Sequence, residues 1–193
     1  ERFWAFVEEG GYEVRERSEG AKVLYRFQKP KAGDFPAMLE LFSRAREGLK
    51  LSEDAHLTPL PIDKAAASLS AILLDESYYD FLKSMVREVG GIPVLGEAAI
   101  IPFKARAWLD LTRQREEGGN VDEKNIRKHR NDVARLLQLL SQEARYELPS
   151  SVADDMRSFV EQATAEADYD PRQFKVNMTR DDVATRLRAA YQL

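Results

Sequence analysis

The spacing of the hydrophobic residues changes about a third of the way along this chain of 193 residues. In residues 12–17 and 22–28, apolar side chains recur every second residue, which is the period of a β-strand. Beyond Pro61 they recur at the spacing of amphipathic helices. The change predicts an α+β chain in which a small sheet is followed by a helical bundle. We expect two domains, residues 1–62 and residues 63–193.

The first domain is predicted to contain one short helix and about three strands. Residues 1–9 place apolar side chains on one helical face, and Gly10–Gly11 ends that helix. Residues 12–17 and 22–28 then alternate in polarity around a Ser-Glu-Gly sequence that is typical of a turn. These two segments predict a β-hairpin.

The third predicted strand, residues 35–42, is apolar on both faces apart from Glu40. Such a run is typical of a strand that is covered from both sides. A carboxylate in a covered strand has to be paired, neutral or bound to a metal. The alternative is an edge strand on which Glu40 lies in water.

The second domain is predicted to be a bundle of about five helices. Their ends are marked by glycine, by proline and by side chains that cap helices. The expected helices cover residues 65–89 (one or two helices, closed by Gly90–Gly91), Pro102 to about 117, the cap Asp122 to about 142, 149–151 to about 167, and a last segment after a Thr179–Asp182 capping box.

Composition excludes several classes of protein. The chain has no cysteine, which rules out disulfides, thiolate zinc sites, iron–sulfur clusters and cysteine nucleophiles. Its net charge of -4 argues against a uniformly basic, nucleic-acid-binding surface, although a local basic patch remains compatible with it. No apolar run approaches the length of a membrane span, and the start lacks the pattern of a signal peptide. We therefore expect a cytoplasmic protein without a membrane partner.

Lys104 is the first unusual residue of the helical part, because its neighbours on one helical face are all apolar. They are Ile100, Ile101, Ala107, Trp108 and Leu111. An ammonium group in such a stripe needs an anion nearby or a path to solvent. Either the stem of Lys104 lies on apolar surface while the head reaches water, or the lysine points into a cleft to meet a phosphate or a carboxylate.

A basic run, residues 124–132, is the second unusual feature. On a helix it places His129 close to the apolar stripe and Asp132 on the flank of that stripe. One interpretation is a solvated helix face with weak ion pairs and a hydrogen-bonded core histidine. The other makes Asp132 an acceptor or an orienting group beside a cleft, and the basic cluster a docking patch for phosphates.

Four segments together resemble the nucleotidyltransferase-like proteins of the AbiEii/AbiGii abortive-infection toxin superfamily. The segments are MLELFSR, SLSAILLDESYYDFL, IIPFKARAWLDL and IRKHRNDVARLLQLL. The resemblance covers most of the chain between about Phe3 and Leu140. It implies a nucleotidyltransferase fold in which residues 1–62 are the C-terminal part of the α/β domain.

The resemblance also implies a site. Glu40 would be the strand carboxylate and a ligand of Mg²⁺, and Lys104 would contact the phosphates of an NTP. Lys128 would bind the nucleotide as well, and Asp132 would orient Lys104 or the hydroxyl of the acceptor. The implied catalytic residues are therefore Glu40, Lys104 and Asp132, with Mg²⁺ and NTP as cofactors.

The expected activity is transfer of a nucleotide to an RNA (tRNA included), a protein or a small-molecule acceptor, in a protein of the toxin–antitoxin kind with an antitoxin partner. The aspartate pair of the family is not found, since Gly10–Gly11 is followed by Tyr-Glu-Val-Arg. The chain begins Glu-Arg-Phe-Trp without Met, and we expect the pair to lie upstream. The alternative is a non-catalytic module of the same fold that binds nucleic acid or protein.

Overall fold

The computed structural model describes residues 2–16, 22–44, 57–60 and 69–193. Its contacts divide the chain into two compact units, Glu1–Tyr79 and Asp80–Leu193. The first unit holds most of the strands and the second most of the helices, which confirms the α+β class. The expected domain boundary after residue 62 falls next to residues 61–68, outside the described residues, and stays a prediction.

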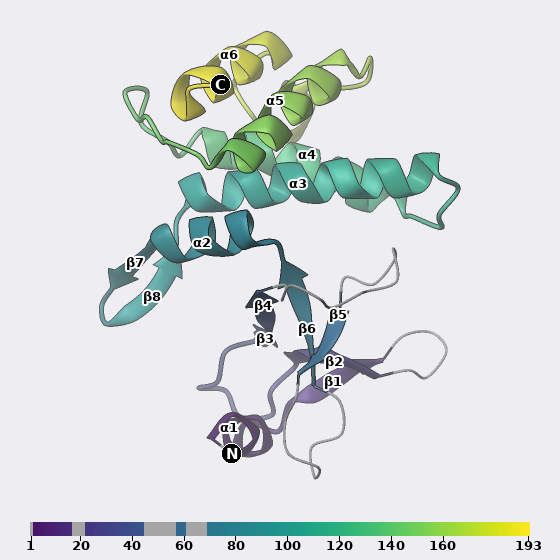
Figure 1. Ribbon diagram of the computed structural model, residues 1–193, viewed down its shortest axis with the longest axis vertical. Coiled ribbons are helices and arrows are strands. Elements are labelled where there is room, and N and C mark those ends of the chain that lie inside the picture. Colours follow the sequence, from purple (N-terminus) through teal and green to yellow (C-terminus); the bar gives the residue numbers. More distant parts are fainter. Residues whose placement is uncertain (1, 17–21, 45–56, 61–68) are drawn as a thin grey trace. The chain divides into compact units, whose positions relative to one another are not determined.

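The elements are labelled in Figure 1. Those of the first unit and of the connection to the second are α1 (Arg2–Gly10), β1 (Glu13–Glu16), β2 (Lys22–Gln28), β3 (Met38–Glu40), β4 (Phe42–Arg44), β5 (Leu57–Leu60), β6 (Leu69–Leu74) and α2 (Glu76–Ser84). Those that follow are β7 (Val86–Val89), β8 (Ile92–Leu95), α3 (Glu97–Glu116), α4 (Glu123–Leu137), α5 (Ser150–Ala165), the 3₁₀ helix η1 (Pro171–Phe174) and α6 (Arg180–Tyr191).

The predicted hairpin is confirmed, since β1 pairs antiparallel with β2. The segment between them, residues 17–21, lies outside the described residues. β2 also pairs antiparallel with β3, so one sheet has the order β1-β2-β3. Phe27 of β2 is fully buried and makes edge-to-face contacts with Phe3 and Trp4 of α1. The helix face predicted for residues 1–9 therefore packs on this sheet.

The prediction of a single third strand over residues 35–42 is wrong. That segment contributes β3 to the first sheet and the start of β4 to a second sheet, of order β4-β6-β5. β4 runs parallel to β6, and β5 runs antiparallel to it. β5 contains Pro59 and lies at an edge, where the missing N–H of a proline is tolerated.

The prediction of helix over residues 65–89 is also wrong. Leu69–Leu74 is a strand, α2 follows it, and β7 pairs with β8 in a hairpin around Gly90–Gly91. Both glycines have positive φ, of 59° and 80°, and so form a hairpin turn instead of ending a helix. A short apolar run such as LSAILL fits a buried strand and a buried helix equally well.

The second unit is built around α3, which α4 and α5 both contact (Figure 1). α6 packs against α4 and α5. The core between these helices is apolar, and Trp108 of α3 meets Phe159 of α5 edge to face, with ring centroids 5.4 Å apart. The helical bundle predicted after the sheet is thus present in this unit.

Pro102 does not start its helix as predicted, because α3 begins at Glu97 and Pro102 lies inside it. A proline in a helix interior leaves the carbonyl of the residue four positions earlier without its N–H partner. That residue is Ala98, and the hydroxyl of Tyr191 on α6 donates a buried hydrogen bond of 2.9 Å to its carbonyl oxygen. Tyr191 therefore replaces the hydrogen bond that Pro102 removes.

Two predicted helix starts are confirmed. The Asp122 side chain accepts a hydrogen bond from the backbone N–H of Lys124 at the start of α4. Thr179 and Asp182 form the capping box of α6. Within the described residues, no helix combines the length and the apolar character needed to cross a membrane.

Candidate functional site

Lys104 and Asp132, which the sequence singled out separately, lie together in the helical unit. The Lys104 ammonium on α3 donates to a carboxylate oxygen of Asp132 on α4, with Nζ and Oδ2 2.9 Å apart. The two side chains are 28% and 21% exposed. Asp132 is thus the anion that a lysine in this apolar stripe requires, and the ammonium group still reaches the surface.

Asp132 also accepts a hydrogen bond from Arg135 one turn along α4. The Nη1 of Arg135 lies 3.3 Å from Oδ1, so the two oxygens of the carboxylate face different cations. One carboxylate between Lys104 and Arg135 leaves the group with a net positive charge. This geometry holds the two cations in place and offsets only one of their two positive charges.

His129 lies next to this group and is half-buried on α4. Burial lowers its pKa from 6.5, and the positive charges of Lys104 and Lys128 lower the pKa further, while Asp132 opposes them. The imidazole therefore carries less positive charge at a given pH than an ordinary histidine does. Its Nδ1 is buried and has no hydrogen-bond partner among the described residues. His129 is thus partly buried, but this atom lacks the hydrogen bond predicted for a core histidine.

Lys128 lies on the exposed side of α4, as do its neighbours Lys124 and Arg127. Arg127 contacts Glu123 one turn earlier, at 3.7 Å, which is a weak surface ion pair. Lys124, Arg127 and Lys128 thus form a solvent-facing basic strip on α4.

Glu40 belongs to the other unit and is paired there. It lies opposite Arg26 in the register of β2 and β3, and the Arg26 guanidinium donates to its carboxylate. Among the described strands β3 lies at the edge of its sheet, and Met38 of β3 and Phe42 at the start of β4 are each 48% exposed. The expectation of a strand covered from both sides is therefore wrong.

The described residues do not fit a Mg²⁺ site. They contain no group of three or more histidine, cysteine, aspartate or glutamate side chains that could hold a metal ion. Glu40 already has a cation partner in Arg26. We therefore assign no metal ligand in this part of the chain.

Arg130 is an organising residue that the sequence analysis did not single out. Its side chain is 4% exposed and makes ion pairs with Glu166 and with Asp168, the latter at 3.1 Å. Its guanidinium also lies 4.6 Å from the ring centroid of Tyr169. Burial raises the pKa of Tyr169 to about 12. Arg130 thereby fixes the segment after α5 against α4.

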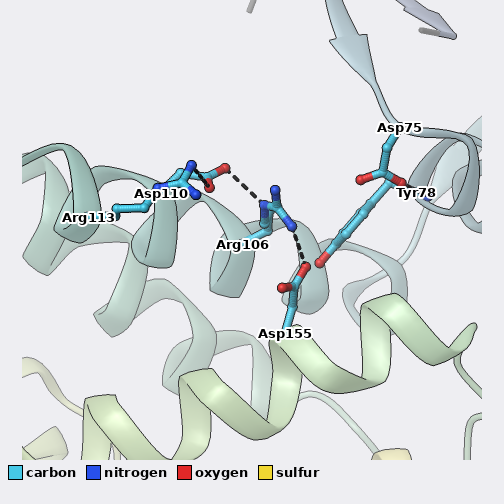
Figure 2. A network of polar contacts seen from close by, with 6 residues as sticks. All are labelled: Asp75, Tyr78, Arg106, Asp110, Arg113 and Asp155. Atoms are coloured by element: carbon cyan, nitrogen blue, oxygen red, sulfur yellow. Dashed lines mark hydrogen bonds and ion pairs between the residues drawn. The ribbon is translucent and has the colours of Figure 1, made fainter. Parts of the chain in front are cut away.

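A second network of ion pairs, partly buried, involves Arg106 in the Lys-Ala-Arg-Ala segment of α3. Figure 2 shows its guanidinium between two carboxylates, with Nε 3.0 Å from Asp110 and Nη1 2.7 Å from Asp155 of α5. Although partial burial alone would lower it, these hydrogen bonds raise the pKa of Arg106. Arg106 therefore links α3 to α5, and it lies two residues after Lys104.

Comparison of the chain with protein-family models, with curated proteins and with solved structures finds no match.

Proposed function

We propose that the protein is a nucleotidyltransferase-like protein whose helical unit binds the phosphates of an NTP through Lys104. The observation that carries this proposal is the 2.9 Å ion pair between Lys104 and Asp132. It joins a lysine whose neighbours on one helical face are apolar to an aspartate at the end of the basic run. A lysine held by a carboxylate at a half-covered position is suited to a phosphate ligand.

The chemistry that these residues offer is binding and charge compensation. The ammonium group of Lys104 gives one N–H to Asp132 and has further N–H donors for phosphate oxygens. Asp132 acts as a positioning residue, because it fixes the direction of the lysine. In nucleotide transfer an acceptor hydroxyl replaces pyrophosphate on the α-phosphorus, and a fixed cation near the phosphates stabilises the charge on that leaving group.

The lowered pKa of His129 supports the same assignment. A charged imidazole would compete for Asp132, whereas a neutral one leaves this carboxylate to Lys104 and Arg135. Lys128 adds a positive charge on the exposed side. This reaction class uses Mg²⁺, and the described residues offer no set of ligands for it.

The experiment is incubation of the protein, with the upstream segment that is expected to carry the aspartate pair present, with labelled NTP, Mg²⁺ and a set of RNA, protein and small-molecule acceptors. We expect label transfer by this wild-type protein and transfer at least about tenfold slower in Lys104→Ala, which corresponds to the loss of one charge-assisted hydrogen bond. Lys83→Ala, which removes an exposed lysine of α2, is the matched control and should retain activity. Equal transfer by wild type and Lys104→Ala would overturn the assignment of Lys104.

A non-catalytic binding module is the second candidate, and the exposed basic strip of α4 favours it. Lys124, Arg127 and Lys128 present their charges to solvent on one helix. This candidate predicts RNA or protein binding without label transfer, with an affinity that falls steeply with salt. Lys128→Glu should weaken that binding, and an affinity independent of both salt and this substitution would count against it.

A further inference from the structure

A second basic site lies where the last turn of α4 faces η1. The surface there has a depression of about 460 Å³ that is open to solvent. It is lined by Arg135, Gln173, Phe174 and Lys175. Two of these four side chains are cations and one is an amide, so the lining is suited to an anion.

The position of Arg135 is fixed from two sides. Its guanidinium lies 5.4 Å from the ring centroid of Phe174, and one of its nitrogens donates to Asp132. A guanidinium has several N–H donors in a fixed plane, and this arrangement leaves others for a ligand. Arg135 is half-exposed, so an anion in the depression can reach it.

Phe174 forms the wall of the depression. Its ring stacks on Tyr169 with centroids 6.2 Å apart, and Arg135 lies over the same ring. With Tyr169 and Arg135 against it, Phe174 is occupied by protein contacts. A negatively charged group is therefore a better ligand here than an aromatic base.

Lys175 is held in an unusual backbone conformation. It ends η1 with φ 68° and ψ 30°, in the left-handed region that favours glycine or asparagine. A glycine would adopt this backbone conformation without strain, so the turn itself does not require the lysine side chain. Asp170, the cap residue before η1, accepts a hydrogen bond of 2.9 Å from Arg172, and this hydrogen bond lowers the pKa of Asp170.

We propose that this depression binds a phosphoryl group through Arg135 and Lys175. The site goes beyond the proposed function, since it does not require nucleotide transfer or Lys104. The phosphoryl group belongs either to a free polyphosphate such as the pyrophosphate part of a nucleotide, or to the backbone of a nucleic-acid strand.

The experiment measures binding of inorganic pyrophosphate and of a short single-stranded RNA to the full chain at low salt. The variants are Lys175→Gly and Arg135→Gln, and Lys83→Gln is the control for loss of a lysine elsewhere. We expect about tenfold weaker binding in each variant and unchanged binding in the control. Lys175→Gly should melt at the same temperature as wild type or higher, because glycine fits the left-handed backbone.

The two ligands distinguish the source of the phosphoryl group. Binding of pyrophosphate alone assigns the site to free polyphosphates, and binding of RNA that pyrophosphate displaces assigns it to a nucleic-acid backbone. Lack of binding by both ligands, or binding that Lys175→Gly and Arg135→Gln leave unchanged, would overturn the proposal. The Lys104→Ala test is a separate measurement, so each proposal can fail without the other.

Discussion

Two charged residues, Lys104 and Arg130, lie on the apolar stripes of α3 and α4. Lys104 and Arg130 both occupy positions where the helical period predicts apolar side chains, and both have carboxylate partners. Lys104 is partly exposed and its pair lies at the surface, whereas the Arg130 side chain is almost fully covered. The first arrangement suits a ligand contact and the second a structural anchor.

The Lys104–Asp132 pair should be measurable as a coupling energy. We expect Lys104→Met and Asp132→Asn to show a coupling of about 0.5–1 kcal/mol in a double-mutant cycle, since the pair is partly screened by solvent. Urea unfolding of the two single variants, the double variant and the wild type gives this value. A coupling indistinguishable from zero would mean that the pair contributes no orienting force.

His129 should make stability depend on pH. Its folded-state pKa lies below 6.5, so between the two pKa values the unfolded chain binds more protons than the folded one. Stability from this residue is present above the unfolded pKa and is lost as the pH falls below it. The free energy of unfolding of the wild type should therefore drop more between about pH 7.5 and about pH 5.5 than that of His129→Gln, measured by urea unfolding. Equal slopes in the two proteins would contradict this.

At the scale of elements, the longest helix of the described part depends on a contact with the last one. Pro102 interrupts the hydrogen bonding of α3, and Tyr191 of α6 compensates at the Ala98 carbonyl. Burial raises the pKa of Tyr191, so its hydroxyl keeps the proton that it donates.

Tyr191→Phe should destabilise the chain by about 1–3 kcal/mol, because it leaves a buried carbonyl without a donor. The same substitution in a Pro102→Ala background should cost less, since the alanine N–H then serves Ala98. Thermal or urea unfolding of the four proteins tests this. An equal cost in both backgrounds would show that the hydroxyl does not replace the proline's missing donor.

Element prediction from the sequence succeeded where local chemistry alone decides the structure. The Asp122 cap, the Thr179–Asp182 capping box and the β1–β2 hairpin involve residues close in sequence. It failed for Leu69–Leu74, whose strand conformation depends on pairing with β4 and β5. It also failed for Pro102, because the donor that makes an interior proline tolerable comes from a distant helix.

At the scale of the molecule, the chain consists of two units with separate cores. One core joins α1 to the β1-β2-β3 sheet, and the other lies among α3, α4, α5 and α6. The candidate phosphate contacts, Lys104 and Arg135, both belong to the helical unit.

Residues 75–193 should therefore fold on their own. This fragment begins at Asp75, whose carboxylate accepts from the Tyr78 backbone N–H and caps α2, and it contains the whole helical core. We expect a helical circular dichroism spectrum and a cooperative thermal transition. A fragment that melts without cooperativity would mean that the helical unit requires the first one.

The sequence singled out individual charged residues, but it did not predict their partners. Lys104 and Asp132 were recognisable from their positions, but their contact depends on how α3 packs on α4. The Glu40 partner depends on strand register for the same reason. Arg130 could have been found, since it is four residues after Ile126 and three before Val133 on the buried stripe of α4.

The central claim is that Lys104, positioned by Asp132, binds the phosphates of an NTP. Equilibrium titration of the folded chain with an NTP tests it most directly, with Lys104→Ala, Asp132→Asn and the control Lys83→Ala measured in parallel. The account predicts about tenfold weaker binding in Lys104→Ala, a smaller loss in Asp132→Asn and none in the control. NTP binding that is absent from the wild type, or equally tight in Lys104→Ala, would contradict it.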